Sequence, residues 1–125
     1  MDREKGRRVK QTKLERQRNL VYFLILATLV LNVFDSATTG YFVLRYGLSV
    51  EANPIAYAMI ANMGIVGFHL LKLVGVTFML LFIWFVVEAI QTPRLMLLTL
   101  IMILAVFGIL AFAVINNYSQ IGSLI

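Results

Sequence analysis

The sequence of 125 residues has no cysteine, a single histidine and only two prolines. The lack of cysteine excludes disulfides, thiol redox chemistry and metal ligation by thiolates. One histidine cannot build a zinc site with several imidazole ligands, and the chain contains no HExxH motif. The sequence therefore predicts neither a bound metal nor a cofactor.

Charged residues are also scarce, at 14% of the chain, whereas hydrophobic residues make up 61% and the mean hydropathy is +0.89. A water-soluble protein of this size cannot hide so much apolar surface in its core. Three apolar stretches are long enough to cross a bilayer core of about 30 Å, namely residues 20–44, 63–87 and 95–115. We therefore predict an all-α membrane protein with three transmembrane helices. Its parts are a basic cytoplasmic tail (1–19), a three-helix domain (20–118) and a polar external tail (119–125).

Positive charge is concentrated at the N-terminal end. Residues 1–19 contain eight Lys and Arg against three Asp and Glu, whereas the rest of the chain contains three of each sign. Basic residues beside a transmembrane helix favour the cytoplasmic side. We therefore predict a multi-pass protein of the cell (inner or cytoplasmic) membrane, with a cytoplasmic N-terminus and an external C-terminus. The basic segment should contact anionic lipid head groups and extend the first helix from about Val9. Membrane orientation explains this segment more simply than nucleic-acid binding, which we do not expect.

The connection after the first span contains residues typical of a helix start. Asn53 is a good N-cap, and Pro54 suits the first helical position. A helix from Pro54 to Glu88 would be about 52 Å long at 1.5 Å per residue, well beyond one membrane span. We therefore predict a break at Asn62–Gly64. The short helix before it, at 54–61, lies at the outer interface or dips partly into the bilayer.

Polar side chains within the predicted spans gather on single helix faces. At 100° per residue, the first span has one polar stripe, made of Thr28, Asn32, Asp35 and Thr39. In the second span His69 and Lys72 are three residues apart and share a face. We expect these two faces to meet inside the protein and not to face lipid.

The depths of the two charges predict an ion pair. Asp35 and Lys72 are each nine residues from the predicted outer end of their span, which places both about 13 Å below the outer surface. An unpaired charge at such a depth costs at least about 2.5–3.5 kcal/mol. We therefore predict that Lys72 neutralises Asp35, with hydrogen bonds supplied by Asn32, Thr39 and His69.

Glu51 lies at the external mouth of this predicted site. The sequence leaves four roles open for it: a cap of the helix at Pro54, a partner of Arg45, a contact with the Asp35 site, or an exposed loop carboxylate. The third span is nearly devoid of polar groups before residues 116–117. We expect that span to cover the site and to face lipid.

Four short motifs occur in order within residues 31–80: DSATT at 35–39, YG at 46–47, EANP at 51–54 and LLKL at 70–73. This ordered set resembles the bacterial and archaeal membrane family designated domain of unknown function 5658, whose members look like short three-helix proteins. The resemblance implies a shared site on the matching residues of this chain: Asp35, Thr38, Thr39, Gly47, Glu51, Asn53, Pro54 and Lys72. Asn32, His69 and the basic segment lie outside the pattern. The resemblance implies no activity, because none is assigned to the family.

We favour a structural role for the predicted site. The buried pair of Asp35 and Lys72 would fix how the first two helices align in a small accessory or assembly protein, since buried pairs contribute specificity more than net stability. An alternative is transport of a proton, an ion or a small solute, because ionisable residues inside membranes mark such pathways. Three helices cannot enclose a pathway alone, so transport requires a homo-oligomer. Small residues at Ser36-x-x-x-Gly40, or at positions 105, 108 and 111, would supply its contacts.

A third alternative is a lipid-modifying membrane enzyme. Asp35 or Glu51 would then act as the base, and Lys72 would polarise the substrate. A metal held by Asp35, Glu51 and His69 is a variant of this reading, although the ligand set differs from that of a multi-histidine zinc site.

Overall fold

The computed structural model describes residues 2–51 and 53–124. In chain order its elements are α1 (Asp2–Tyr46), the short 3-10 helix η1 (Leu48–Val50), α2 (Pro54–Ala89) and α3 (Pro93–Leu124), and these residues include no strand. The three long helices are long and apolar enough to cross a membrane, which indicates a membrane protein. We call the end of the bundle at the α1–α2 connection the loop end, and the end at residues 90–92 the link end.

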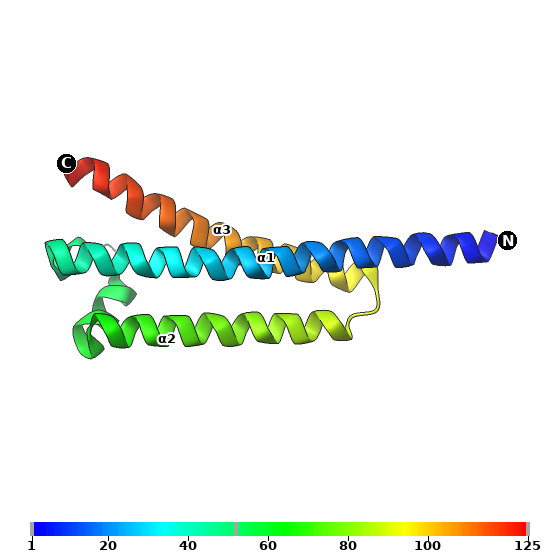
Figure 1. Cartoon of the computed structure of the whole chain (residues 1–125), viewed down its shortest axis with the longest axis horizontal. Helices are drawn as coiled ribbons and strands as arrows, with labels where there is room; N and C mark the ends of the chain where they lie inside the picture. Colours follow the sequence, from blue (N-terminus) through cyan, green and yellow to red (C-terminus); the bar gives the residue numbers. More distant parts are fainter. Residues whose placement is uncertain (1, 52, 125) are drawn as a thin grey trace.

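Helix α1 runs without interruption through the predicted tail and the first predicted span. Its 45 residues correspond to about 67 Å at 1.5 Å per residue. The basic segment is rich in Lys, Arg, Gln and Glu, which favour helix, so α1 begins at Asp2 and not near Val9 as predicted. Residues 2–19 account for about 27 Å of this length, and the N-terminal part of this segment projects beyond the ends of α2 and α3 (Figure 1).

The connection between α1 and α2 is shaped by one glycine and one cap. Gly47 has φ 87° and ψ 169°, a backbone conformation that is essentially confined to glycine, and α1 therefore ends at Tyr46. The Gly47 N–H still donates to the carbonyl oxygen of Val43 at 3.0 Å. At the other side, the Asn53 side chain caps α2 as predicted, and Pro54 occupies the first helical position.

Helix α2 changes direction at Gly64, inside the predicted break. Gly64 has φ 75° and ψ 166°, so two helical arms meet there within α2. The short helix predicted at 54–61 is the first of these arms and is longer than predicted, because Asn62 and Met63 remain helical. Whether this arm lies at a membrane interface or enters the bilayer stays a prediction.

Gly64→Ala is expected to destabilise the protein through backbone strain alone. A Cβ added at Gly64 would meet no atom within 4 Å, so the penalty comes from φ, and such strain costs about 1–3 kcal/mol. Gly75→Ala is the matched control, because Gly75 is helical and a Cβ there is also unobstructed. Thermal unfolding in one detergent should show a lower midpoint for Gly64→Ala than for Gly75→Ala. Equal unfolding midpoints for the two variants would contradict the left-handed backbone conformation at Gly64.

Helix α3 extends further than the third predicted span. It begins at Pro93, and the Met96 N–H donates to the carbonyl oxygen of Thr92 at 3.1 Å. It then continues to Leu124 through most of the segment predicted as a polar tail. No proline interrupts this segment, and each added helical residue gains a backbone hydrogen bond.

Helix α1 is the centre of the bundle, because α2 and α3 each pack on it and touch one another only slightly (Figure 1). The apolar core lies toward the link end and comprises Val21, Leu24, Leu80, Val87, Ile90, Met96 and Ile103. A smaller cluster at the loop end contains Ala56, Ile60 and Phe68. The outward faces carry exposed large apolar side chains such as Phe78, Phe82 and Phe85, as a surface in contact with lipid requires.

Candidate functional site

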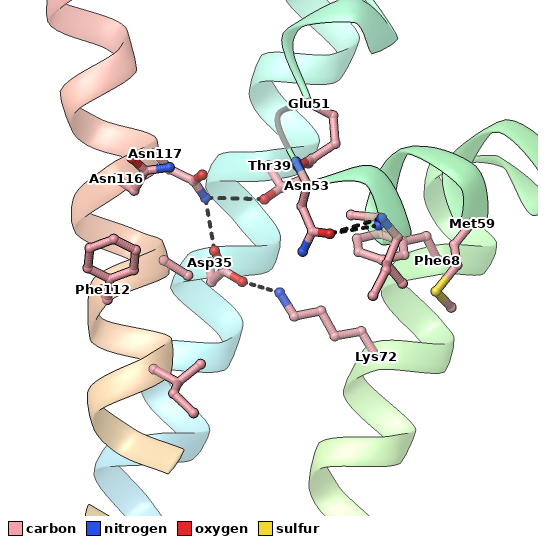
Figure 2. Close-up of a pocket in the computed structure, with 14 residues that line it drawn as sticks. Asp35, Thr39, Glu51, Asn53, Met59, Phe68, Lys72, Phe112, Asn116 and Asn117 are labelled. Carbon is pink, nitrogen blue, oxygen red and sulfur yellow. Dashed lines mark hydrogen bonds and ion pairs between the residues drawn. The ribbon is translucent and has the colours of Figure 1, made fainter. Parts of the chain in front are cut away.

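Asp35 of α1 is bonded to both other helices at once. Lys72 of α2 forms an ion pair with Asp35 Oδ2, and Nδ2 of Asn117 of α3 donates to Asp35 Oδ1 at 2.9 Å (Figure 2). The same Asn117 nitrogen donates to Thr39 Oγ1 at 3.3 Å. Asp35 is only 5% exposed, so its charge depends on these partners.

The helical period explains why these groups meet. Asp35 and Thr39 are four residues apart on α1 and therefore share the face turned toward α3. The ion pair with Lys72 agrees with the similar depths of the two charges in their spans. The hydrogen bond predicted from Thr39 to the ion pair is not formed, and the Thr39 hydroxyl instead accepts from Asn117.

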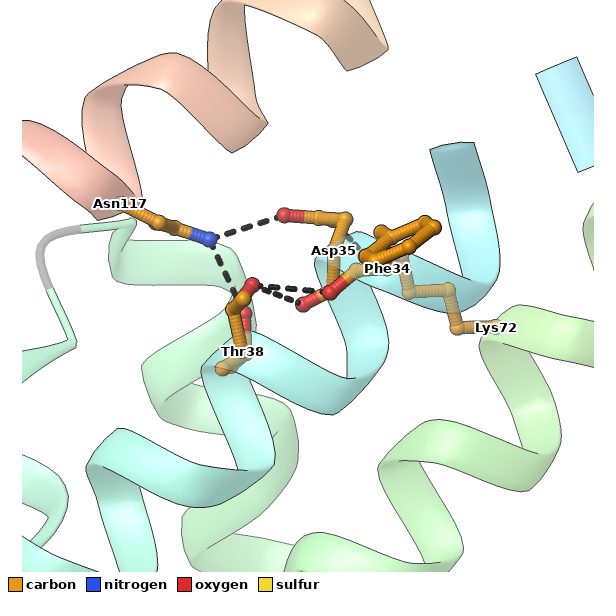
Figure 3. A network of polar contacts seen from close by, with 6 residues as sticks. Phe34, Asp35, Thr38, Lys72 and Asn117 are labelled. Carbon is orange, nitrogen blue, oxygen red and sulfur yellow. Dashed lines mark hydrogen bonds and ion pairs between the residues drawn. The ribbon is translucent and has the colours of Figure 1, made fainter. Parts of the chain in front are cut away.

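Thr38, which belongs to the family pattern, forms its hydrogen bonds with the backbone of α1. Its hydroxyl donates to the carbonyl oxygens of Phe34 at 2.9 Å and Asp35 at 3.0 Å (Figure 3). Such bonds satisfy a hydroxyl inside an apolar helix without a partner from another helix. Thr38 therefore adjoins the site but makes no bond to the Asp35 carboxylate.

Asn32 is fully buried, yet neither its Oδ1 nor its Nδ2 has a hydrogen-bond partner among the described residues. Thr28, one turn further toward the link end, is also fully buried, and its hydroxyl has no hydrogen-bond partner among the described residues. The predicted hydrogen bond from Asn32 to the ion pair is not formed. Buried polar groups are usually hydrogen-bonded, so Asn32 and Thr28 are exceptions within the polar stripe.

The hydrogen bond predicted from His69 to the Asp35–Lys72 pair is not formed. Neither of its ring nitrogens has a hydrogen-bond partner among the described residues. The ring packs on α1, where a Cβ added at Gly40 would lie 2.9 Å from His69 Nε2. Gly40 of the Ser36-x-x-x-Gly40 motif is therefore in close contact with α2 within the chain.

The Glu51 carboxylate accepts a hydrogen bond from the Asn53 N–H and does not pair with Arg45. Its Oε1 accepts from the Asn53 N–H at 2.8 Å, while Asn53 Oδ1 accepts from the N–H groups of Ile55 at 3.0 Å and Ala56 at 3.4 Å. Arg45 instead has its guanidinium 5.8 Å from the ring centroid of Tyr46. The N-cap of α2 is Asn53, so the predicted capping of this helix by Glu51 is not formed; Glu51 instead accepts from the N-cap residue and lines the same cavity as Asp35.

A cavity of about 490 Å³ adjoins the ion pair at the loop end and is bordered by all three helices (Figure 2). Its polar lining consists of Asp35, Thr39, Glu51, Asn53, Lys72, Asn116 and Asn117. The rest of the wall is apolar and includes Phe68, Ile109 and Phe112. Volumes of about 300–1,000 Å³ are typical of small-molecule sites. Among the residues described, no three His, Asp or Glu side chains gather in a way that suits a metal ion.

Asn117 was not among the predicted site residues. We expected the third span to cover the site with apolar side chains, but α3 contributes the amide that bonds both Asp35 and Thr39. A signal was present, because residues 116–117 interrupt a long apolar run. A polar amide at the depth of a buried carboxylate is a natural hydrogen-bond partner.

Two contacts that the sequence did not predict join α1 to α2 at the link end. The Arg18 guanidinium donates to the carbonyl oxygen of Ile90 at 3.1 Å, directly after the end of α2. The Tyr22 hydroxyl donates to Glu88 Oε1. A cation at the carbonyl end of a helix is stabilised by the helix dipole. The two ends of the α1–α2 contact are therefore held by polar bonds.

The fold and the site define a three-helix membrane protein with a buried ion pair beside a polar cavity. The family described as Domain of unknown function (DUF5658) matches residues 26–121, and the chain belongs to this family. The matched range includes every residue of the Asp35–Lys72–Asn117 network and the cavity. No curated protein and no solved structure matches the chain.

Proposed function

We propose that the protein is an accessory or assembly protein of the membrane, in which Asp35 holds the three helices in a fixed arrangement at the loop end. The observation that carries this proposal is the bonding of one carboxylate to Lys72 of α2 and Asn117 of α3 at the same time. Because α2 and α3 touch one another only slightly, Asp35 supplies a link between them that direct packing does not.

The distribution of apolar residues supports a structural role over conduction by a single chain. The polar stripe on α1 ends at Thr28, and the buried cluster that includes Val21, Leu24, Met96 and Ile103 fills the bundle beyond it. An ion would have to cross this apolar cluster without polar partners, which is energetically costly.

The cavity favours a second candidate function, transport of a small solute by an oligomer. Its ionisable lining resembles the sites found along transport pathways. Since Gly40 is covered by His69, the contacts between copies would fall on α3, where Gly108 has no neighbour within 4 Å of an added Cβ.

The two candidate functions differ in what the double variant Asp35→Asn/Lys72→Met does. This variant replaces the pair by neutral groups of similar size, so a structural pair should be replaceable without loss of the fold. Wild type and variant are reconstituted in liposomes, and proton, sodium and potassium flux is measured with ion-sensitive dyes. We expect neither protein to raise flux above that of empty liposomes. If the wild type raised ion flux and the variant did not, the transport proposal would be favoured over the structural one.

We also propose that the loop end is external and that the basic segment is cytoplasmic, where it contacts anionic lipid head groups. The excess of Lys and Arg in residues 1–19 supports this orientation in the cell membrane. The chain has no cysteine, so a single introduced thiol reports its own location. In intact cells, a membrane-impermeant maleimide should label Ser49→Cys, whereas it should label Thr92→Cys only after lysis. The reverse pattern would invert the orientation.

A further inference from the structure

Two hydrogen-bond donors with spare capacity face the same space in the cavity. Asn53 uses its Oδ1 to cap α2, and its Nδ2, at the other end of the amide, points toward the Asp35–Lys72 pair (Figure 2). This nitrogen has no partner among the described residues. The Lys72 ammonium carries three hydrogens, and its one bond in the described residues is to Asp35. An oxygen acceptor with negative charge is the group that both donors would bind.

At the mouth of the cavity, the lining favours a cation instead of an anion. Glu51 is half-buried and accepts one backbone hydrogen bond, but no basic side chain pairs with it among the residues described. Its second carboxylate oxygen is left for a cation.

The charges of the lining select between ligand classes. Asp35 and Glu51 carry two negative charges and Lys72 carries one positive charge, so the cavity has a net charge of −1. The net negative charge of the lining would repel a purely anionic ligand. A simple cation would leave the hydrogen-bond donors of Lys72 and Asn53 without an acceptor. A ligand with both charges satisfies both sets of groups.

We propose that the cavity binds a zwitterion, with an ammonium group at Glu51 and an anionic oxygen between Lys72 and Asn53. Phosphoethanolamine has this chemistry. The apolar wall formed by Ile109 and Phe112, which are 69% and 71% exposed, lies beside the gap between α2 and α3. An aminophospholipid can therefore place its head group in the cavity and its acyl chains along α3. This proposal goes beyond the structural role of the Asp35–Lys72 pair and does not depend on it.

The test uses the full chain in neutral detergent micelles doped with phosphatidylethanolamine or with phosphatidylglycerol, which lacks the ammonium group. Bound lipid is measured by native mass spectrometry and by the shift in unfolding temperature. We expect preferential binding of phosphatidylethanolamine. Glu51→Gln and Asn53→Asp should each weaken this binding by roughly tenfold, the effect of losing one charge-assisted hydrogen bond. Glu51→Gln retains an oxygen that can accept from the Asn53 N–H, and Asn53→Asp retains the oxygen that caps α2. Glu15→Gln, on the basic segment, is the matched control.

Soluble phosphoethanolamine distinguishes the source of the zwitterion. Competition by the soluble compound supports a zwitterion site that needs no acyl chain, whereas phosphatidylethanolamine binding without competition supports a lipid site. Equal binding of the two lipids would overturn the proposal, as would wild-type binding by Glu51→Gln and Asn53→Asp. Unfolding temperatures without added lipid show whether each variant is folded, and either variant alone suffices for the comparison.

Discussion

Lys72→Met is expected to lower the free energy of unfolding by about 3–5 kcal/mol, because it leaves a buried carboxylate without its cation. Asp35 is 5% exposed and would keep only the hydrogen bond from Asn117. Asp35→Asn should cost less, since the Lys72 side chain is 20% exposed and can reach the cavity once its partner is neutral. The double variant should recover most of the loss, because it leaves no unpaired charge.

Unfolding of the four proteins by sodium dodecyl sulfate in mixed micelles gives the coupling energy between the two sites. Lys13→Met is the matched control, because Lys13 is exposed on the basic segment and should change stability by no more than about 0.5 kcal/mol. Losses from the two single variants that simply add in the double variant would show that Asp35 and Lys72 do not interact.

Asn117→Leu is the variant expected to release α3 from α1 at the loop end. It removes two hydrogen bonds and leaves Asp35 Oδ1 and Thr39 Oγ1 without a donor from α3, at a cost of about 1–3 kcal/mol. Asn116→Leu is the control, because the neighbouring side chain is exposed and forms no hydrogen bond among the described residues.

The same variants can be followed by the distance between α1 and α3. Spin labels on one introduced cysteine in each helix, near the loop end, should give a broader distance distribution in Asn117→Leu than in Asn116→Leu. Indistinguishable distributions and equal unfolding energies would show that α3 is held by apolar packing alone.

The ion pair was predictable because two independent constraints point to it. Asp35 and Lys72 are the charged residues deep in the first two predicted spans, and their distances from the span ends are equal. Charges in an apolar region need partners, so their pairing follows without knowledge of how the helices cross. The N-cap at Asn53 was predictable for a similar reason, since it depends only on adjacent residues.

The contacts that were missed depend on how neighbouring helices pack. Asn117 reaches Asp35 only because α3 packs on α1 at this depth, and a neutral amide gives no electrostatic reason to place it there. His69 and Lys72 differ by about 60° around α2, and the imidazole packs against Gly40 while Lys72 reaches Asp35. The bond from Arg18 to Ile90 depends on where α2 ends, which the sequence constrains only to within a few residues.

The continuity of α1 has a consequence for how the basic segment can act at a membrane surface. In the proposed orientation Arg7 and Arg8 lie about 17–18 Å along the rigid helix from residue 19, at the end of the basic segment, whereas a flexible peptide would let them fold back onto the bilayer. At physiological salt, charges are screened over about 8 Å. In this orientation Arg16 and Arg18 would contact the lipid head groups most strongly, and the contribution of the more distant arginines would be weaker.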